Sequence, residues 1–229
     1  MDGNTAHTIF TLVLTGLLIA WLLGQVRKPS GPLGRRLVQT MNLSHASMTD
    51  WALEHIHVKP DAAILDVGCG GGRTIQRLAA LAPDGVVHGI DYSPASVAAS
   101  RATNAGGIAA GHVQVQLGSV SSLPYPDGSF DLVTAVETHY YWPDLPASMR
   151  EVLRVLKPGG EFALVAETYR GGRFGAVYGV AMRLIRAVYL TDEEHRNLLT
   201  EAGFTEVTTM HAPGKSWICA VGRRPGATV

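Results

Sequence analysis

The stretch that decides the fold runs from Ile64 to Thr74 and reads ILDVGCGGGRT. Its beginning, Ile64–Val67, is a short and mostly apolar run that is typical of a buried strand. Four of the next five residues are glycines, which are needed where the backbone adopts positive φ or approaches a ligand closely. A helix predicted from Arg73 would present free N–H groups at its start. The stretch therefore predicts a strand, a ligand-binding turn and a helix.

Strand-like and helix-like segments alternate on both sides of this turn. The predicted strands cover 62–67, 86–90, 112–117, 130–136, 161–167, 205–211 and 216–221, and the last two form a hairpin. The predicted helices cover 47–57, 73–81, 94–104 and 148–156, with a further helix after Thr191 that ends at Gly203. Capping boxes, Ser47 with Asp50 and Thr191 with Glu194, predict two of the helix starts. Such alternation predicts an α/β, Rossmann-like, doubly wound sheet of seven mostly parallel strands.

Composition excludes several classes of protein. The chain has 229 residues, of which 17% are charged, with 19 basic and 19 acidic side chains. This balance disfavours a nucleic-acid partner. The two cysteines, Cys69 and Cys219, lie far apart and form no ligand cluster, so we expect a reducing compartment and no metal site. The oligomeric state stays open.

The amino-terminal segment is strongly hydrophobic. Residues 8–26 are 19 consecutive uncharged residues, which as a helix would be about 28 Å long, close to the thickness of a bilayer core. Four basic residues follow at positions 27, 28, 35 and 36, which predicts a cytoplasmic location for the rest of the chain. We predict a transmembrane anchor helix over 1–26, a linker and pocket-covering segment over 27–44, the main folded domain over 45–223 and a flexible tail over 224–229. The alternatives are a buried or dimerising helix and a soluble cytoplasmic protein.

A second acidic residue, Asp91, ends the strand that follows the glycine turn. Its carboxylate can accept hydrogen bonds from both hydroxyls of a ribose, and Tyr92 beside it can pack on an adenine ring. A dinucleotide fingerprint would need its third glycine at position 73, where the chain has Arg73. The pattern therefore favours a nucleoside cofactor and disfavours a nicotinamide oxidoreductase.

With these motifs the sequence resembles the class I S-adenosylmethionine-dependent methyltransferases of type 11, and is similar to the quinone-biosynthesis C-methyltransferases. The resemblance covers about residues 50–222, and four segments carry it: Leu65–Gly72, Gly89–Pro94, Leu123–Asp131 and Glu151–Gly160. It implies S-adenosylmethionine as cofactor and a small-molecule methyl acceptor. We interpret Asp131 and the turn at 157–160 as structural, because proline and glycine suffice to end a helix.

The resemblance also implies a cofactor site. Residues that match Asp66, Gly68 and Gly70 hold the amino-acid half of the cofactor in the family, and the residue that matches Asp91 binds ribose. We extend the predicted site to Cys69, Gly72, Thr74, Tyr92, Ser93, Ser119, Val120 and Glu137. Many relatives carry an aspartate where this chain has Ser119, and a hydroxyl accepts a hydrogen bond from adenine less strongly than a carboxylate. We interpret Cys69 as a small filler of a tight turn and not as a nucleophile.

The loop after the fourth strand, Glu137–Trp142, reads ETHYYW. Ligands of open parallel sheets lie beyond the carboxyl ends of the strands, so this loop is predicted to face the reacting methyl group. We predict His139 as a general base, Tyr140 and Glu137 as further catalytic residues, and a substrate site formed by His45, Tyr141, Trp142 and Tyr169. If the loop only packs, the catalytic group must come from His45, Glu167 or the segment 168–190.

Residues 168–190 are predicted to be a lid insertion. Phe174, Tyr178 and Met182 recur at helical spacing, which indicates either a packed helix or the wall of a pocket for an apolar substrate near a membrane, with arginines toward anionic headgroups. We predict a methyltransferase for a small acceptor, with an apolar or membrane-associated acceptor as one option. The alternative is a catalytically silent, cofactor-binding regulatory or scaffold protein.

Overall fold

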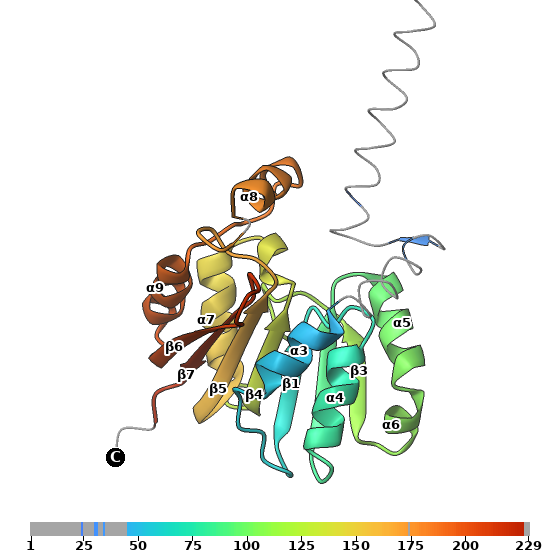
Figure 1. Ribbon diagram of the computed structural model, residues 1–229. Helices are drawn as coiled ribbons and strands as arrows, with labels where there is room; N and C mark the ends of the chain where they lie inside the picture. Colours follow the sequence, from blue (N-terminus) through green and yellow to red (C-terminus); the bar gives the residue numbers. More distant parts are fainter. Residues whose placement is uncertain (1–23, 25–29, 32–33, 35–44, 174, 227–229) are drawn as a thin grey trace, which may run out of the picture.

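Seven strands form one mixed sheet in the computed structural model, which describes residues 24, 30–31, 34, 45–173 and 175–226 (Figure 1). The strand order is β3-β2-β1-β4-β5-β7-β6. The strands are β1 Ala63–Val67, β2 Val86–Asp91, β3 Val113–Leu117, β4 Phe130–Val136, β5 Leu156–Ala166, β6 Thr205–His211 and β7 Ile218–Arg223. Strands β1 to β5 pair in parallel, and β7 is antiparallel to both of its neighbours. The predicted doubly wound, mostly parallel sheet is confirmed.

Helices cover both faces of the sheet. They are α3 Ala46–Leu53, α4 Arg73–Leu81, α5 Pro94–Thr103, α6 Ala105–Ala109, the 3₁₀ turn η1 His139–Tyr141, α7 Leu145–Val155, α8 Gly175–Leu184 and α9 Asp192–Ala202. Successive side chains of a strand point to opposite faces. Ile64 of β1 accordingly packs in a cluster with Leu78 of α4, whereas Leu65 packs in one with Met149 of α7 and Leu199 of α9.

The direction of winding reverses beside β1. The chain goes from β1 to β2 and β3 on one side, and then crosses to β4 and β5 on the other side. At such a reversal the two connecting loops diverge and leave a crevice beyond the carboxyl ends of the strands. The glycine turn after β1 and the loop after β4 border this crevice, which positions the candidate site.

Two predicted local features need correction and two are confirmed. The helix expected from a Ser47–Asp50 capping box begins at Ala46, and its N-cap residue His45 makes no side-chain cap bond. Asp50 instead forms an ion pair with Arg77 of α4, so its carboxylate is used between two helices. The Thr191–Glu194 capping box and the left-handed cap at Gly203 are both present as predicted.

The segment Lys157–Gly160 was expected to be a turn between helix and strand, but it lies inside β5. Phe130 pairs with Leu156 and Leu132 pairs with Glu161, so the strand carries extra residues as a bulge at this point. Gly159 in the bulge has φ +77°, a conformation that favours glycine. The proline and glycines of this segment thus form the bulge in β5.

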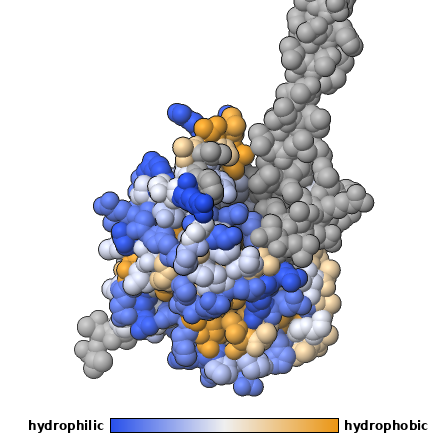
Figure 2. All heavy atoms as spheres, in the orientation of Figure 1, coloured by the Kyte–Doolittle hydropathy of each residue, from blue (hydrophilic) through white to orange (hydrophobic). Residues whose placement is uncertain are grey.

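Helix α8 stands above the carboxyl edge of the sheet, within the predicted insertion 168–190 (Figure 1). Hydrophobic residues gather at the top of the molecule where α8 lies (Figure 2). Val180 and Leu184, one helical turn apart, are 63% and 69% exposed. Their exposure leaves an apolar stripe on the outer side of this helix.

None of the helices in the described part of the chain is long and apolar enough to span a bilayer. The predicted anchor over residues 1–26 lies outside the described residues except for Gly24, and most of the linker 27–44 does too.

Candidate active site

A pocket of about 230 Å³ opens at the carboxyl ends of β1, β2 and β4. Most residues of the predicted cofactor site line it: Asp66, Gly68, Cys69, Gly70, Thr74, Asp91, Tyr92, Ser119, Val120 and Glu137. Three of the predicted substrate residues line it as well: His45, Tyr141 and Trp142. The winding reversal thus brings residues from distant parts of the sequence to one cavity.

The glycine turn approaches the loop after β4 closely. Gly68 has φ +74°, and a Cβ atom at this position would lie 2.0 Å from Oγ1 of Thr138. Gly70 also has positive φ, while a Cβ atom there would meet no heavy atom closer than 4.0 Å. Gly68 is therefore required by packing, whereas Gly70 leaves open space on the pocket side.

Gly72 and Ser93 stand behind the pocket wall, although both were predicted to bind the cofactor. A Cβ atom at Gly72 would lie 2.4 Å from side-chain atoms of Ser100 and Asn104, so this glycine allows the turn to pack on α5. Ser93 is fully buried, and its side chain accepts a hydrogen bond from the backbone of Ser96 as the N-cap of α5. The sequence predicts the position of both residues along the chain, but it does not show whether each one faces the pocket or the packed interior.

Asp66 is buried at the base of the pocket, where Oγ1 of Thr134 donates a 2.7 Å hydrogen bond to its Oδ1. Burial raises the pKa of Asp66 to about 7, and the nearby charge of Asp91 adds to the rise. Asp91 accepts hydrogen bonds from the backbone N–H groups of Gly70, at 3.0 Å, and Ser93, at 2.8 Å. Burial raises the pKa of Asp91 while these bonds lower it. The two carboxylates make this end of the pocket favourable for a cation.

Cys69 lies in the turn as a buried side chain whose thiol contacts Oγ of Ser100 at 3.8 Å. Burial raises the pKa of Cys69 well above that of a free thiol, so the nucleophilic thiolate is disfavoured. The prediction of a small filler is confirmed.

The far end of the pocket is formed by Tyr92, Ser119 and Val120. Oγ of Ser119 accepts a 3.2 Å hydrogen bond from the backbone N–H of Ser121. This hydroxyl already closes its own turn, which weakens it further as an acceptor for an adenine amine. Tyr92 is 41% exposed, which leaves its ring accessible at the rim.

Glu137 directly follows β4 in a strained conformation and lines the pocket. Its φ of +56° lies in the left-handed region, which residues with a Cβ rarely adopt. Oη of Tyr140 donates a 2.9 Å hydrogen bond to its Oε1, and the backbone N–H of Glu167 donates to the same oxygen. Burial raises the pKa of Glu137 to about 7, and the charge of Glu167 contributes to the rise. Two donors therefore hold this carboxyl group rigidly at the pocket wall.

His139 and Tyr140, both predicted to be catalytic, do not line the pocket. His139 is completely buried, and neither of its ring nitrogens has a hydrogen-bond partner among the described residues. Its ring packs against Tyr140 and against His195 of α9. The 3₁₀ turn η1 rotates His139 toward α9, so it cannot reach the pocket as a base. Tyr140 acts on the site through Glu137.

Tyr141 and Trp142 form part of the pocket wall, but Tyr169 does not. The Tyr169 ring packs against His211 with centroids 5.0 Å apart. It belongs to a cluster that also contains Tyr141 and Met182 of α8. Tyr169 therefore supports the substrate side from behind.

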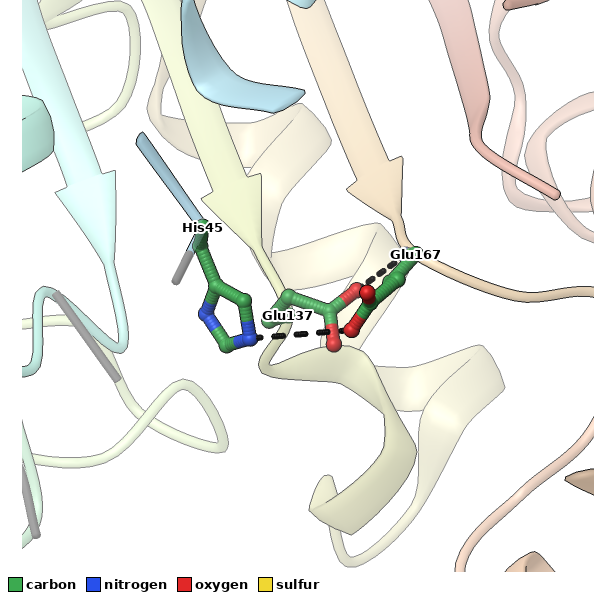
Figure 3. A group of neighbouring side chains, drawn as sticks. All are labelled: His45, Glu137 and Glu167. Atoms are coloured by element: carbon green, nitrogen blue, oxygen red, sulfur yellow. Dashed lines mark hydrogen bonds and ion pairs between the residues drawn. The ribbon is translucent and has the colours of Figure 1, made fainter. Parts of the chain in front are cut away.

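Three ionisable side chains lie close together (Figure 3), and two of them, His45 and Glu137, line the pocket. His45 precedes α3, Glu137 follows β4 and Glu167 follows β5. One ligand atom from each lies within 4.8 Å of the others, and this is the one group in the described part of the chain with the chemistry of a metal-ligand set. Nε2 of His45 lies 3.8 Å from Oε2 of Glu167. Burial lowers the pKa of His45, and the Glu167 charge partly opposes this.

Sequence reasoning missed two arginines of the pocket, Arg73 and Arg77. They follow the glycine turn one helical turn apart on α4, and that spacing was the available signal. Nε of Arg73 is buried without a hydrogen-bond partner among the described residues. Such an unsatisfied donor is costly unless a ligand accepts from it.

The pocket residues fit the cofactor that the resemblance implies. Arg73 offers an unused donor for a carboxylate, and Asp91 offers acceptors for a ribose. Asp66 and Glu137 are carboxylates that no lysine or arginine of the described residues pairs with. They suit the ammonium and sulfonium groups of S-adenosylmethionine.

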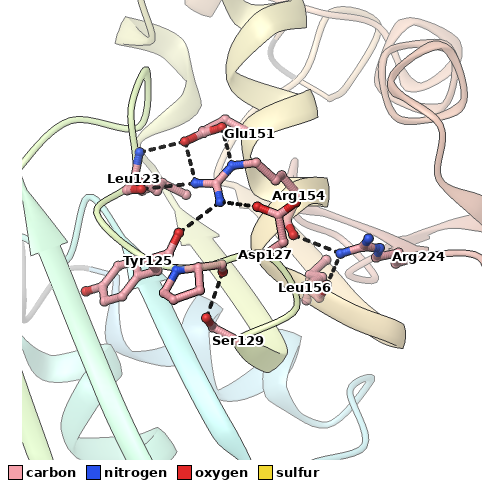
Figure 4. Close-up of polar contacts among 9 residues, drawn as sticks. Leu123, Tyr125, Asp127, Ser129, Glu151, Arg154, Leu156 and Arg224 are labelled. Carbon is pink, nitrogen blue, oxygen red and sulfur yellow. Dashed lines mark hydrogen bonds and ion pairs between the residues drawn. The ribbon is translucent and has the colours of Figure 1, made fainter.

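The last two family-like segments bind each other away from the pocket (Figure 4). Arg154 donates to the backbone carbonyls of Leu123 and Tyr125 and forms ion pairs with Asp127 and Glu151. Elsewhere, Oδ2 of Asp131 accepts from the backbone N–H of Ala63 and from Nζ of Lys157. Asp131 therefore stabilises the fold, as predicted, and does not line the pocket.

Comparison with known proteins gives consistent results. A family described as "Methyltransferase domain" matches residues 65–164. Demethylmenaquinone methyltransferase of Symbiobacterium thermophilum is 35% identical over 136 residues, which are 58% of this chain and 54% of that protein. An uncharacterized methyltransferase of Synechocystis is 36% identical over 162 residues, which are 68% of this chain and 72% of that protein.

Among solved structures, a methyltransferase in complex with the Haloferax volcanii Trm112 activator superposes with a TM-score of 0.70 at 21% identity, covering 82% of this chain and 93% of that one. At this identity the likeness shows the fold alone. The chain spans about half the length of the first curated relatives it matches, namely 54%, 40% and 46% of three of them.

Proposed function

The chain belongs to the class I S-adenosylmethionine-dependent methyltransferases, and from this premise we propose that it methylates a small, apolar or membrane-associated acceptor. The observation that carries the proposal is the pair of buried carboxylates, Asp66 and Glu137, which line one pocket and have no lysine or arginine partner among the described residues. Removing such groups from water is costly unless a cation accompanies them.

In this proposal the pocket residues divide the cofactor between them. Arg73 binds its carboxylate, Asp66 its ammonium group, Asp91 its ribose and Tyr92 with Ser119 its adenine. Glu137 lies beside the sulfonium. When bound, S-adenosylmethionine supplies an electrophilic methyl group whose leaving group is already good, so the protein's main contribution is to hold the two reactants in line.

The acceptor side of the pocket is proposed to lie between His45, Tyr141 and Trp142. Tyr141 packs against the same apolar cluster as Met182 of α8, so the insertion 168–190 supports this side of the pocket from behind. The relative from Symbiobacterium thermophilum is named for demethylmenaquinone, and this supports a small apolar acceptor here.

We further propose that the chain works at a membrane. Residues 8–26 carry no charge, and basic residues follow them. The insertion 168–190 contains four arginines and no acidic residue, and α8 exposes Val180 and Leu184. An exposed apolar stripe beside basic residues suits the surface of an anionic bilayer. The catalytic domain would then lie on the cytoplasmic side.

Calorimetry with S-adenosylmethionine and S-adenosylhomocysteine tests the cofactor assignment. Asp91→Ala is expected to lose roughly 1.5 to 3 kcal/mol of binding, the usual contribution of hydrogen bonds to a charged group. Ser121→Ala, outside the pocket, is the matched control. Turnover of cofactor with a labelled methyl group, against an extract of membrane lipids, distinguishes an enzyme from a silent binder.

Fractionation tests the membrane proposal. The full chain is expected in the membrane fraction after carbonate extraction, whereas a chain that begins at Ser30 is expected to be soluble and still to bind cofactor. A full chain that is soluble and monomeric without detergent would contradict the anchor.

A further inference from the structure

We propose that His45, held by Glu167, accepts the proton that the substrate loses during methyl transfer. The methyl acceptor is therefore a protic nucleophile such as a phenol, an enol or a thiol. This inference rests on the proposed function and names the substrate class of the same site. It replaces His139 in this role, because His139 is buried within η1 against His195 of α9.

The position of His45 carries the first step of the argument. It lines the pocket close to Glu137, which directly follows β4, and ligands of open parallel sheets lie beyond the carboxyl ends of the strands. The imidazole is 20% exposed, so it borders the cavity and solvent at once. A base must reach both the substrate proton and water, and this location satisfies both needs.

The two carboxylates beside His45 are held differently. Oε1 of Glu137 is fixed by two donors, Oη of Tyr140 and the backbone N–H of Glu167. The Glu167 side chain is 44% exposed, and its ion-pair partner in the described part of the chain is His45 at 3.8 Å. Glu137 therefore serves as a fixed charge at the pocket wall, while Glu167 is free to follow the imidazole.

The charges around His45 suit a base. Burial lowers the pKa of His45 and the Glu167 charge raises it, so the imidazole is neutral near pH 7 and gains an ion pair when it is protonated. Glu137 faces it from β4, and Arg73 and Arg77 line the same pocket from α4. Glu167 is a positioning residue, because it acts through His45.

Nε2 of His45 faces Oε2 of Glu167, so the X–H proton of the methyl acceptor passes to the other ring nitrogen, Nδ1, and the electron pair of X forms the bond to the methyl carbon. The carbon–sulfur bond breaks at the same time, and its electron pair stays on sulfur. The imidazolium then releases its proton to solvent past Glu167.

The test compares His45→Gln and Glu167→Gln with His57→Gln, an exposed histidine of the same segment. The dissociation constants for S-adenosylmethionine and S-adenosylhomocysteine, measured by calorimetry, are expected to change less than about threefold in every variant. NMR titration of the wild-type protein and Glu167→Gln is expected to show a lower imidazole pKa for His45 in the variant, because the ion pair stabilises the protonated ring. An unchanged His45 titration would overturn the pairing.

Methyl transfer is measured with 1,4-naphthohydroquinone, phenol and thiophenol as protic probes and N,N-dimethylaniline as the aprotic probe. His45→Gln is expected to slow transfer to the protic probes by roughly 10²- to 10⁴-fold, the usual contribution of a general base, and Glu167→Gln by less. The displacement of iodide from methyl iodide by S-adenosylhomocysteine, which forms S-adenosylmethionine, removes no proton, so His45→Gln should keep it.

Several results would overturn the proposal. One is a wild-type protein that methylates none of the protic probes, and another is His45→Gln with the full rate on them. A third is transfer that chelator abolishes and Mg²⁺ or Mn²⁺ restores, which would assign the cluster to a metal. A wild-type protein that does not bind the cofactor would instead contradict the proposed function itself.

Discussion

Oη of Tyr140 donates a 2.9 Å hydrogen bond to Oε1 of Glu137, so a residue behind the pocket controls the charge of a residue in its wall. The bond favours the ionised form of Glu137 against the effect of burial, which raises its pKa to about 7. The loop after β4 thus influences the site through an intermediary.

Replacing Tyr140 by Phe removes this bond and should weaken binding of S-adenosylmethionine about tenfold at pH 7, because a hydrogen bond to a charged group contributes about 1.5 kcal/mol or more. S-adenosylhomocysteine, which lacks the sulfonium charge, should be affected less. Calorimetry measures both. Tyr125→Phe, outside the pocket, is the control, and equal losses for the two cofactor forms would argue against an electrostatic role.

Affinity for S-adenosylmethionine should depend on pH. The pKa values of Asp66 and Glu137 are each raised to about 7 in the free protein, and a cationic ligand favours the ionised carboxylates. Binding should therefore release protons and strengthen from pH 6 to pH 8. Calorimetry in buffers of different ionisation enthalpy counts the protons released. Glu137→Gln should reduce that count, and a pH-independent affinity would contradict this account.

Asp66 and Glu137 also affect the stability of the fold, and this effect has the opposite pH dependence to that of cofactor binding. A carboxyl group whose pKa is raised by folding stabilises the protein at low pH and loses that contribution as pH rises through the folded value. The contribution of Asp66 and Glu137 to the free energy of unfolding of the cofactor-free protein is therefore smaller above pH 7 than below it. Bound cofactor should remove this penalty.

His139→Leu should preserve cofactor binding and stabilise the protein. His139 is buried with both ring nitrogens unsatisfied among the described residues, and leucine of similar volume needs no hydrogen bond. Removing the unsatisfied groups should gain about 1 to 2 kcal/mol, measured by urea unfolding at pH 7.5. A large loss of stability would show that an ordered water satisfies the ring.

The pH dependence gives an independent check on the same variant. Burial lowers the pKa of His139 well below its usual value, so the unfolded chain takes up a proton below about pH 6.5 while the folded one does not. This contribution of His139 to stability becomes less favourable with acidification in that range, opposite in sign to the contributions of Asp66 and Glu137. Relative to the wild type, His139→Leu should therefore gain stability between pH 7 and pH 5.5, while His195 keeps its own unfavourable contribution in both proteins.

The sequence predicted the strands and the order of pocket residues because periodicity and glycine chemistry act locally. The turn at Gly68–Gly72 and the carboxylate of Asp91 lie at the strand ends where the pattern put them. The direction of a side chain in an irregular loop depends on tertiary packing instead. The sequence predicts His139 at the cavity, but the 3₁₀ turn η1 directs its ring toward α9. His45 lines the pocket from the start of α3 instead.

Arg154→Lys should destabilise the fold without weakening the site. The guanidinium of Arg154 binds two carbonyl oxygens and two carboxylates at once, which joins the loop 123–127 to α7. A lysine has three donors on a single nitrogen and cannot reproduce this planar fork. Loss of two or more of these bonds should cost about 2 to 3 kcal/mol, measured as a lower urea midpoint. The neighbouring exposed Arg150→Lys is the matched control and should change little.

Because Arg154 does not line the pocket, the folded variant should bind S-adenosylmethionine as the wild type does. A variant of normal stability, or one that loses cofactor affinity while folded, would show that this clamp serves the site and not the fold.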